Sequence, residues 1–181
     1  MNIMKTDTGE ALSGILSGRE ERAKARDHHL SEGVFACQIT LNIPGYPKRI
    51  KNDCRAIEKF ALLFSLRWGS DPFRTDMISN EAGLCWIGFF RGWGSDTQRA
   101  KKVAVDLEEC SPEGRILDID IIVCGKSISR SDLGLPARSC ILCGRTAKEC
   151  AREMSHAYSD LRAAVKKLIK NFECLFFGHT M

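Results

Sequence analysis

The sequence predicts a single α+β domain in which a small mixed sheet is flanked by helices. Three runs rich in β-branched and aromatic residues are typical of strands, at 33–43, 83–92 and 116–124. Two other segments, 51–68 and 161–172, repeat apolar residues every three or four positions, as helices on a core do. With 181 residues, the chain is long enough to bury one core.

The N-terminal part predicts a helix, a strand and a second helix in that order. Residues 9–30 begin with an apolar stripe and become strongly charged from Arg19 onward, so the second half should be solvated or face a ligand. The strand at 33–43 ends at a proline-glycine turn, and Lys48 lies just beyond it. The helix at 51–68 stops at a Gly-Ser-Asp-Pro sequence and should pack on the sheet.

A further strand is predicted over 100–109, because apolar and polar side chains alternate there. The turn at 110–114 leads directly into the strand at 116–124, so we expect the two strands to be antiparallel neighbours. Asp106 or Glu108 would then face the acidic positions of the following strand.

The stretch GRILDIDIIV, residues 114–123, places Asp118 and Asp120 one residue apart in an otherwise apolar run. Successive side chains of a strand point to opposite faces, so these two carboxylates share one face. Two interpretations stay open. The pair belongs to a solvent-facing surface, or the two carboxylates converge on divalent metal ions, which remove their mutual repulsion.

Composition narrows the class of protein. Hydrophobic residues make up 44% and charged residues 28% of the chain, which is ordinary for a soluble globular protein. The net charge of +4 is too small for a dedicated nucleic-acid binder, and no segment has the apolar length of a membrane span. The chain starts without the apolar core of a signal peptide and carries nine cysteines, so we expect a cytoplasmic protein with reduced thiols.

Three arginines lie in turns near the acidic strand, namely Arg115, Arg130 and Arg138. The planar guanidinium group suits bidentate contact with phosphate. Arginines in turns are also common on any protein surface, so the residues alone leave both interpretations open.

A cluster of cysteines follows the arginines. Cys140 and Cys143 form a C-x2-C motif, and Cys150 and His156 follow at spacings that a tetrahedral zinc site accepts. Cysteine is also one of the most often buried residues, so a set of packed, reduced thiols is the alternative. The wide gap between the second and third cysteines favours packed thiols.

The order of these motifs resembles the citrate lyase holo-acyl-carrier-protein synthase family, whose members are apo-citrate lyase phosphoribosyl-dephospho-CoA transferases. The resemblance spans about residues 10–172. It rests on the sequences GREER, NIPGYPK, GRILDIDIIV and ISRSDLGLPARSCILC, followed by CAR and a histidine before an amphipathic helix.

The resemblance implies transfer of phosphoribosyl-dephospho-CoA from its triphosphate precursor to a serine of the citrate lyase acyl-carrier subunit, with loss of pyrophosphate. It also implies a nucleotidyltransferase-like fold in which Asp118 and Asp120 hold Mg²⁺, with Asp106 or Glu108 as a further ligand. The cations expected to contact the donor phosphates are Lys48, Arg115, Arg130 and Arg138.

We therefore expect one transferase domain over 1–181, with an acidic-strand core at about 33–136 and a Cys/His segment plus C-terminal helix at about 138–173. Two alternatives stay open. One is a zinc-knuckle interaction module, in which the acidic strand has no role. The other is a related nucleotidyltransferase with another acceptor, such as the carrier protein of malonate decarboxylase.

Overall fold

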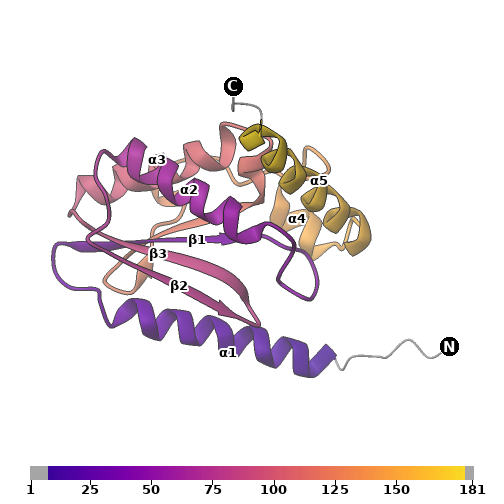
Figure 1. Cartoon of the computed structure of the whole chain (residues 1–181), viewed down its shortest axis with the longest axis horizontal. Coiled ribbons are helices and arrows are strands. Elements are labelled where there is room, and N and C mark those ends of the chain that lie inside the picture. Colours follow the sequence, from indigo (N-terminus) through magenta and orange to yellow (C-terminus); the bar gives the residue numbers. More distant parts are fainter. Residues whose placement is uncertain (1–7, 178–181) are drawn as a thin grey trace.

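A computed structural model describes residues 8–177 of the chain, and the side chains of residues 9–170. The described residues form a five-stranded sheet with helices on both faces (Figure 1). The elements are α1 (Thr8–Asp27), β1 (Val34–Leu41), α2 (Asp53–Trp68), β2 (Arg74–Asn80), β3 (Gly83–Arg91), α3 (Ser95–Glu109), η1 (Glu113–Ile116), β4 (Leu117–Val123), β5 (Lys126–Ser127), η2 (Ser131–Leu133), α4 (Ala147–Arg152) and α5 (Tyr158–Phe177).

The strand order is β2-β3-β1-β4-β5, and each pair of neighbouring strands is antiparallel. The predicted α+β class is confirmed, whereas the sheet is antiparallel instead of mixed. In Figure 1, α2, α3 and α5 lie on one side of the sheet and α1 crosses the other side. The larger apolar core fills the space between the sheet and α2 and α3, and a smaller one lies on the α1 side.

The strand predicted over 100–109 is wrong, because these residues belong to helix α3. The buried positions of α3 include Ala100, Ala104 and Leu107, which follow the helical period. Lys101 and Glu108 are buried on the same helix, so two polar residues interrupt the apolar stripe and conceal it in the sequence. The turn after α3 therefore joins a helix to β4, and β4 pairs with β1 on one side.

Strand β2 was not predicted, because most of its side chains are exposed and its sequence is polar. The other expected elements are confirmed within a few residues. They are the helices α1, α2 and α5 and the strands β1, β3 and β4.

Gly114 brings the chain from α3 into β4 at very close range. A Cβ atom at this position would lie 2.2 Å from the carbonyl oxygen of Leu107, which is far below contact distance. Only glycine allows η1 to pack directly against the end of α3. This contact sets where β4, and with it the acidic pair, begins.

Candidate active site

Asp118 and Asp120 share one face of β4, as the sequence predicts. They lie opposite Thr40 and Gln38 of β1, on the side of the sheet that α1 partly covers. The hydroxyl of Ser127 donates a hydrogen bond of 2.9 Å to Asp120. The side chain of Asp118 is 53% exposed, so a ligand can reach it.

The surroundings of Asp118 raise the pKa of its carboxyl above the ordinary value. The largest cause is the loss of solvation, and the negative charge of Asp120 adds to it. The positive charge of Arg138 opposes both effects. Two like charges on one face therefore favour either a proton or a cation at this position.

The outer edge of β4 is closed by side chains along 117–119. The ammonium group of Lys101 donates to the carbonyl oxygen of Ile119 at 2.9 Å, and the Ile119 amide donates to Glu108 at the same distance. Arg138 donates to the carbonyl oxygen of Leu117 at 2.7 Å. Strand β5 pairs with β4 only beyond this stretch, so the helix α3 holds the acidic strand through buried polar contacts.

Glu108 is the centre of an ion-pair network. Its carboxylate accepts hydrogen bonds of 2.5 Å from Arg130 and from Arg138, and its side chain is 3% exposed. Arg130 also pairs with Glu109, and Arg138 donates a second bond of 3.3 Å to Asp118. One arginine thus links the buried glutamate to the acidic strand.

Asp106 and Glu108, the two acidic residues predicted as further metal ligands, lie in surroundings that differ from the prediction. Asp106 lies on the exposed side of α3, because 100–109 is a helix and not the neighbouring strand. Both carboxylate oxygens of Glu108 are occupied by arginines and by the Ile119 amide. In the described part of the chain, no third carboxylate, histidine or cysteine converges with Asp118 and Asp120.

A cavity of about 630 Å³ brings three of the predicted cations together. Its charged lining consists of three arginines, Arg115, Arg130 and Arg138, and two glutamates, Glu108 and Glu109. These side chains together carry a net charge of +1. Its volume is within the ordinary range for a small-molecule site. The loop between Pro136 and Gly144 forms the rest of the wall.

Lys48 lies outside this cavity, in a second basic group. Its ammonium donates to the carbonyl oxygen of Ile43 at 2.8 Å. Burial lowers the pKa of Lys48, and the positive charges of Arg19 and Arg162 lower it further. The structure therefore brings together three of the four predicted donor-binding residues and separates the fourth.

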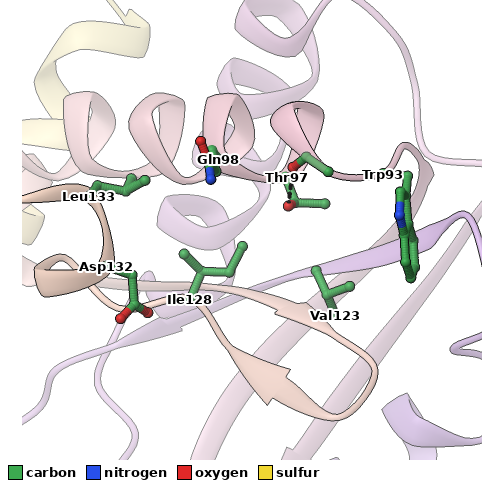
Figure 2. Close-up of a pocket in the computed structure, with 8 residues that line it drawn as sticks. Trp93, Thr97, Gln98, Val123, Ile128, Asp132 and Leu133 are labelled. Atoms are coloured by element: carbon green, nitrogen blue, oxygen red, sulfur yellow. Dashed lines mark hydrogen bonds between the residues drawn. The ribbon is translucent and has the colours of Figure 1, made fainter.

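A second cavity, of about 410 Å³, lies at the other end of β4 (Figure 2). Trp93 borders one side, Asp132 and Leu133 border the other, and Val123 and Ile128 lie between them. None of the predicted site residues lines it.

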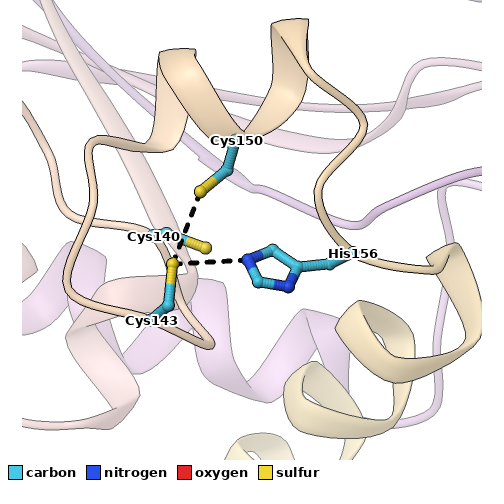
Figure 3. Close-up of side chains that lie close together, drawn as sticks. All are labelled: Cys140, Cys143, Cys150 and His156. Carbon is cyan, nitrogen blue, oxygen red and sulfur yellow. Dashed lines mark hydrogen bonds between the residues drawn. The ribbon is translucent and has the colours of Figure 1, made fainter.

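The cysteine motif forms a compact group, which we call the Cys/His cluster: Cys140, Cys143, Cys150 and His156 (Figure 3). Their four potential ligand atoms lie within 4.8 Å of one another. The amide of Arg145, followed by the Cys150 thiol and His156, lowers the pKa of Cys143 to about 6. Burial, followed by the hydrogen bond with Cys143, raises the pKa of Cys150 to about 11.

Comparison with known proteins decides the family. The model of the apo-citrate lyase phosphoribosyl-dephospho-CoA transferase family matches residues 10–172. The chain belongs to this family. The span agrees with the resemblance seen in the sequence, and the predicted enzyme class, a transferase, is confirmed.

Individual relatives of the transferase family match most of the chain. A probable apo-citrate lyase phosphoribosyl-dephospho-CoA transferase of Vibrio cholerae is 39% identical over 93% of this chain and 96% of its own length. One of Streptococcus pyogenes serotype M18 is 31% identical over 91% and 89%. Protein CitXG of Leuconostoc mesenteroides is 36% identical over 90% of this chain but only 35% of its own, longer chain.

Sequence reasoning missed two buried cations of this transferase. The alternating pattern places Lys101 in a strand, and Arg22 is predicted as part of a charged helix half and, with Arg19, as an alternative position for the donor. Arg22 is 6% exposed and donates to Asn80 at 3.3 Å from α1. Gly14 and Gly18 precede it at four-residue spacing, and a Cβ atom on Gly18 would lie 2.6 Å from Asn80. That glycine spacing was the available signal that this face of α1 contacts the sheet.

Proposed function

We propose that the chain transfers phosphoribosyl-dephospho-CoA from its triphosphate precursor to a serine hydroxyl of the citrate lyase acyl-carrier subunit, releasing pyrophosphate. The serine oxygen forms the new bond to phosphorus, the bond to pyrophosphate breaks, and the serine proton is lost. The observation that carries the proposal is the bridge formed by Arg138, which connects a cationic cavity to the acidic strand. The family match supports the donor and the acceptor.

Asp118 and Asp120 fit the requirements of a magnesium site. Mg²⁺ is usually bound through one or two carboxylates, with substrate phosphates and waters as the other ligands. The two side chains share a face, and Asp118 is half exposed. When bound, a divalent ion would neutralise charge on the triphosphate during transfer.

The chain's own residues prepare this site. Arg138 orients Asp118, and Ser127 orients Asp120, so each carboxylate has one fixed oxygen. We assign Glu108 to holding Arg130 and Arg138, because its oxygens are already engaged. Donor phosphates and water are then the remaining metal ligands.

The arginine-lined cavity is the proposed position of the donor phosphates. Arg115, Arg130 and Arg138 offer planar groups that bind phosphate oxygens in pairs. Ion pairs with Glu108 and Glu109 fix Arg130 and Arg138 before the donor arrives, so donor binding costs little side-chain conformational entropy. The basic group of Lys48, Arg19 and Arg162 is a second set of cations for the phosphates of the dephospho-CoA part.

We further propose that the protein acts in the cytoplasm. The eight cysteines whose side chains are described are all free, which suits a reducing compartment. Among the described helices, none has the length and apolar character needed to cross a membrane.

The test is intact-mass analysis of the acyl-carrier subunit after incubation with this protein, the triphosphate donor and Mg²⁺. We expect the mass of one prosthetic group to appear on the carrier, together with an equal amount of pyrophosphate. A carrier whose acceptor serine is replaced by alanine should stay unmodified, and a reaction without Mg²⁺ should fail. Faster modification of the malonate decarboxylase carrier protein, or transfer of a plain nucleotide, would overturn the assigned acceptor or donor.

A further inference from the structure

The segment from Ser139 to Ala157 has almost no apolar core of its own. Within it, Cys140 and Cys150 are the only buried side chains, and both belong to the Cys/His cluster. Leu142 and Met154, which could have formed a core, are 42% and 80% exposed. Helix α4 has six residues, too few to be stable alone. Apart from Ile141, which packs partly buried against the main core, the segment has little apolar packing beyond these two thiols.

The cluster has the geometry of a metal centre. The sulfur of Cys143 lies 3.4 Å from the sulfur of Cys150 and 3.3 Å from Nε2 of His156. In Figure 3 the three thiols and the imidazole point toward one common centre from the C-x2-C turn, α4 and the segment before α5. Ligand bonds of about 2.0–2.3 Å from one central ion span separations of this size.

Three thiolates and one imidazole form a soft, nitrogen and sulfur donor set, which selects Zn²⁺ over Mg²⁺. Four protein ligands also fill a tetrahedral coordination sphere, so no position is left for substrate or water. Such a closed site has a structural role.

We infer that the Cys/His cluster binds one structural Zn²⁺ ion, which fixes the loop that carries Arg138. The thiols bind as thiolates and release their protons to solvent when the ion enters.

Backbone contacts connect the cluster to the arginine-lined cavity. The carbonyl oxygen of Cys140 accepts a hydrogen bond from the Arg115 side chain. Ser139 and Thr146 form an isolated β-bridge, and the Ala147 amide donates to the carbonyl oxygen of Arg138 at 2.8 Å. The ligands therefore flank the residues that hold Arg138 in place. Within this scheme the cluster residues are positioning residues, and they do not touch the reacting atoms.

Elemental analysis of the full chain, purified without added metal or chelator, tests the inference directly. We expect about one zinc per chain, and a zinc content near zero in Cys143→Ala. The ligand exchange His156→Cys keeps four suitable donors and should retain zinc, whereas His156→Ala should lower it. Cys110→Ser and Cys124→Ser, at exposed cysteines outside the cluster, are the matched controls and should keep full zinc.

If the ligand variants fail to fold, the wild-type protein still decides the matter. Removal of zinc by a strong chelator should lower the melting temperature, and stoichiometric Zn²⁺ should restore it. Co²⁺ in its place should give the absorption bands of tetrahedral thiolate coordination. Metal-free wild-type protein that neither binds these ions nor changes its melting temperature, or a Cys143–Cys150 disulfide in protein kept under reducing conditions, would overturn the inference.

The zinc content is independent of the transfer reaction, so the two proposals fail separately. Asp118→Asn should lose transfer and keep about one zinc per chain. The zinc-depleted protein should bind the triphosphate donor more weakly, because Arg115 and Arg138 lose their fixed positions. Depleted protein with unchanged donor affinity would overturn the positioning role.

Discussion

Arg138 donates a hydrogen bond of 3.3 Å to Asp118 and so connects the arginine-lined cavity to the acidic strand. The same guanidinium also binds the buried carboxylate of Glu108. Any movement of the loop around Arg138 therefore changes the surroundings of the proposed metal site.

Asp118→Asn and Asp120→Asn should each abolish transfer, because each removes one charged oxygen ligand from the proposed magnesium site. The fold should be unchanged, since neither carboxylate belongs to the apolar core. Intact-mass analysis of the acyl-carrier subunit measures the transfer, and circular dichroism checks the fold. Asp71→Asn, at an exposed position, serves as the control, and substantial activity in both test variants would contradict the metal role.

The stability of Asp118→Asn should depend on pH in metal-free buffer. The raised pKa means that the folded protein holds this proton more tightly than the unfolded chain, so ionisation of Asp118 costs stability. The cost is full above the folded pKa and disappears below the ordinary value of 3.8. The variant should thus melt at or above the wild-type temperature at pH 7, and any gain should vanish near pH 3. A gain that grows as the pH falls would contradict this cause.

Glu108→Ala should destabilise the protein by about 3 kcal/mol, because it removes the buried acceptor that two arginines and the Ile119 amide share. Glu109→Ala is the matched control. Its side chain is 55% exposed, so the loss of its ion pair should cost less than about 1 kcal/mol. Denaturant unfolding of both variants measures the difference, and equal costs would show that Glu108 does not organise the network.

Arg138→Lys should weaken donor binding by about tenfold, because lysine keeps the charge but loses the planar pair of donors. Arg145→Lys is the control, since that side chain is half exposed, pairs with Glu153 and does not line the cavity. Calorimetric titration with the triphosphate donor measures both. Equal affinities for the two variants would exclude Arg138 as a donor contact.

Gly114→Ala should destabilise the fold by about 3 kcal/mol, because the new methyl group collides with the backbone of Leu107. Gly144→Ala provides the comparison, since no atom lies within 4 Å of a Cβ built there. Thermal unfolding of the two variants should show a clear loss for the first and little change for the second. A silent Gly114→Ala would mean that η1 can move away from α3 at little cost.

The apolar elements of the fold could be predicted from the sequence, because a one-sided core imposes its period on β1, α2 and β4. The prediction failed where polar residues are buried or a strand is exposed. Lys101 and Glu108 are buried in α3 because they satisfy the edge of β4, and no periodic pattern reveals that partnership.

The candidate site was predictable in part for the same reason. The face shared by Asp118 and Asp120 follows from strand geometry alone. The cavity depends on how the irregular segment between η2 and α4 folds back over α3, which is set by ion pairs distant in sequence, such as Arg138 with Glu108. The sequence indicated the four residues of the Cys/His cluster but favoured packed thiols, because Cys143 and Cys150 are far apart along the chain. Helix α4 places Cys150 within 3.4 Å of Cys143.

The side-chain contacts along the edge of β4 also limit where a further strand can be added to the sheet. An open strand edge is a template for strand addition by another chain. Along 117–119, the outward-facing backbone groups of Leu117 and Ile119 are bound to side chains of α3 and to Arg138, so an incoming strand finds no free partners there. Self-association by sheet extension is thus directed away from the acidic pair and toward the opposite edge, formed by β2. Under the proposed function, the acyl-carrier subunit would therefore meet no competition from sheet extension at Asp118.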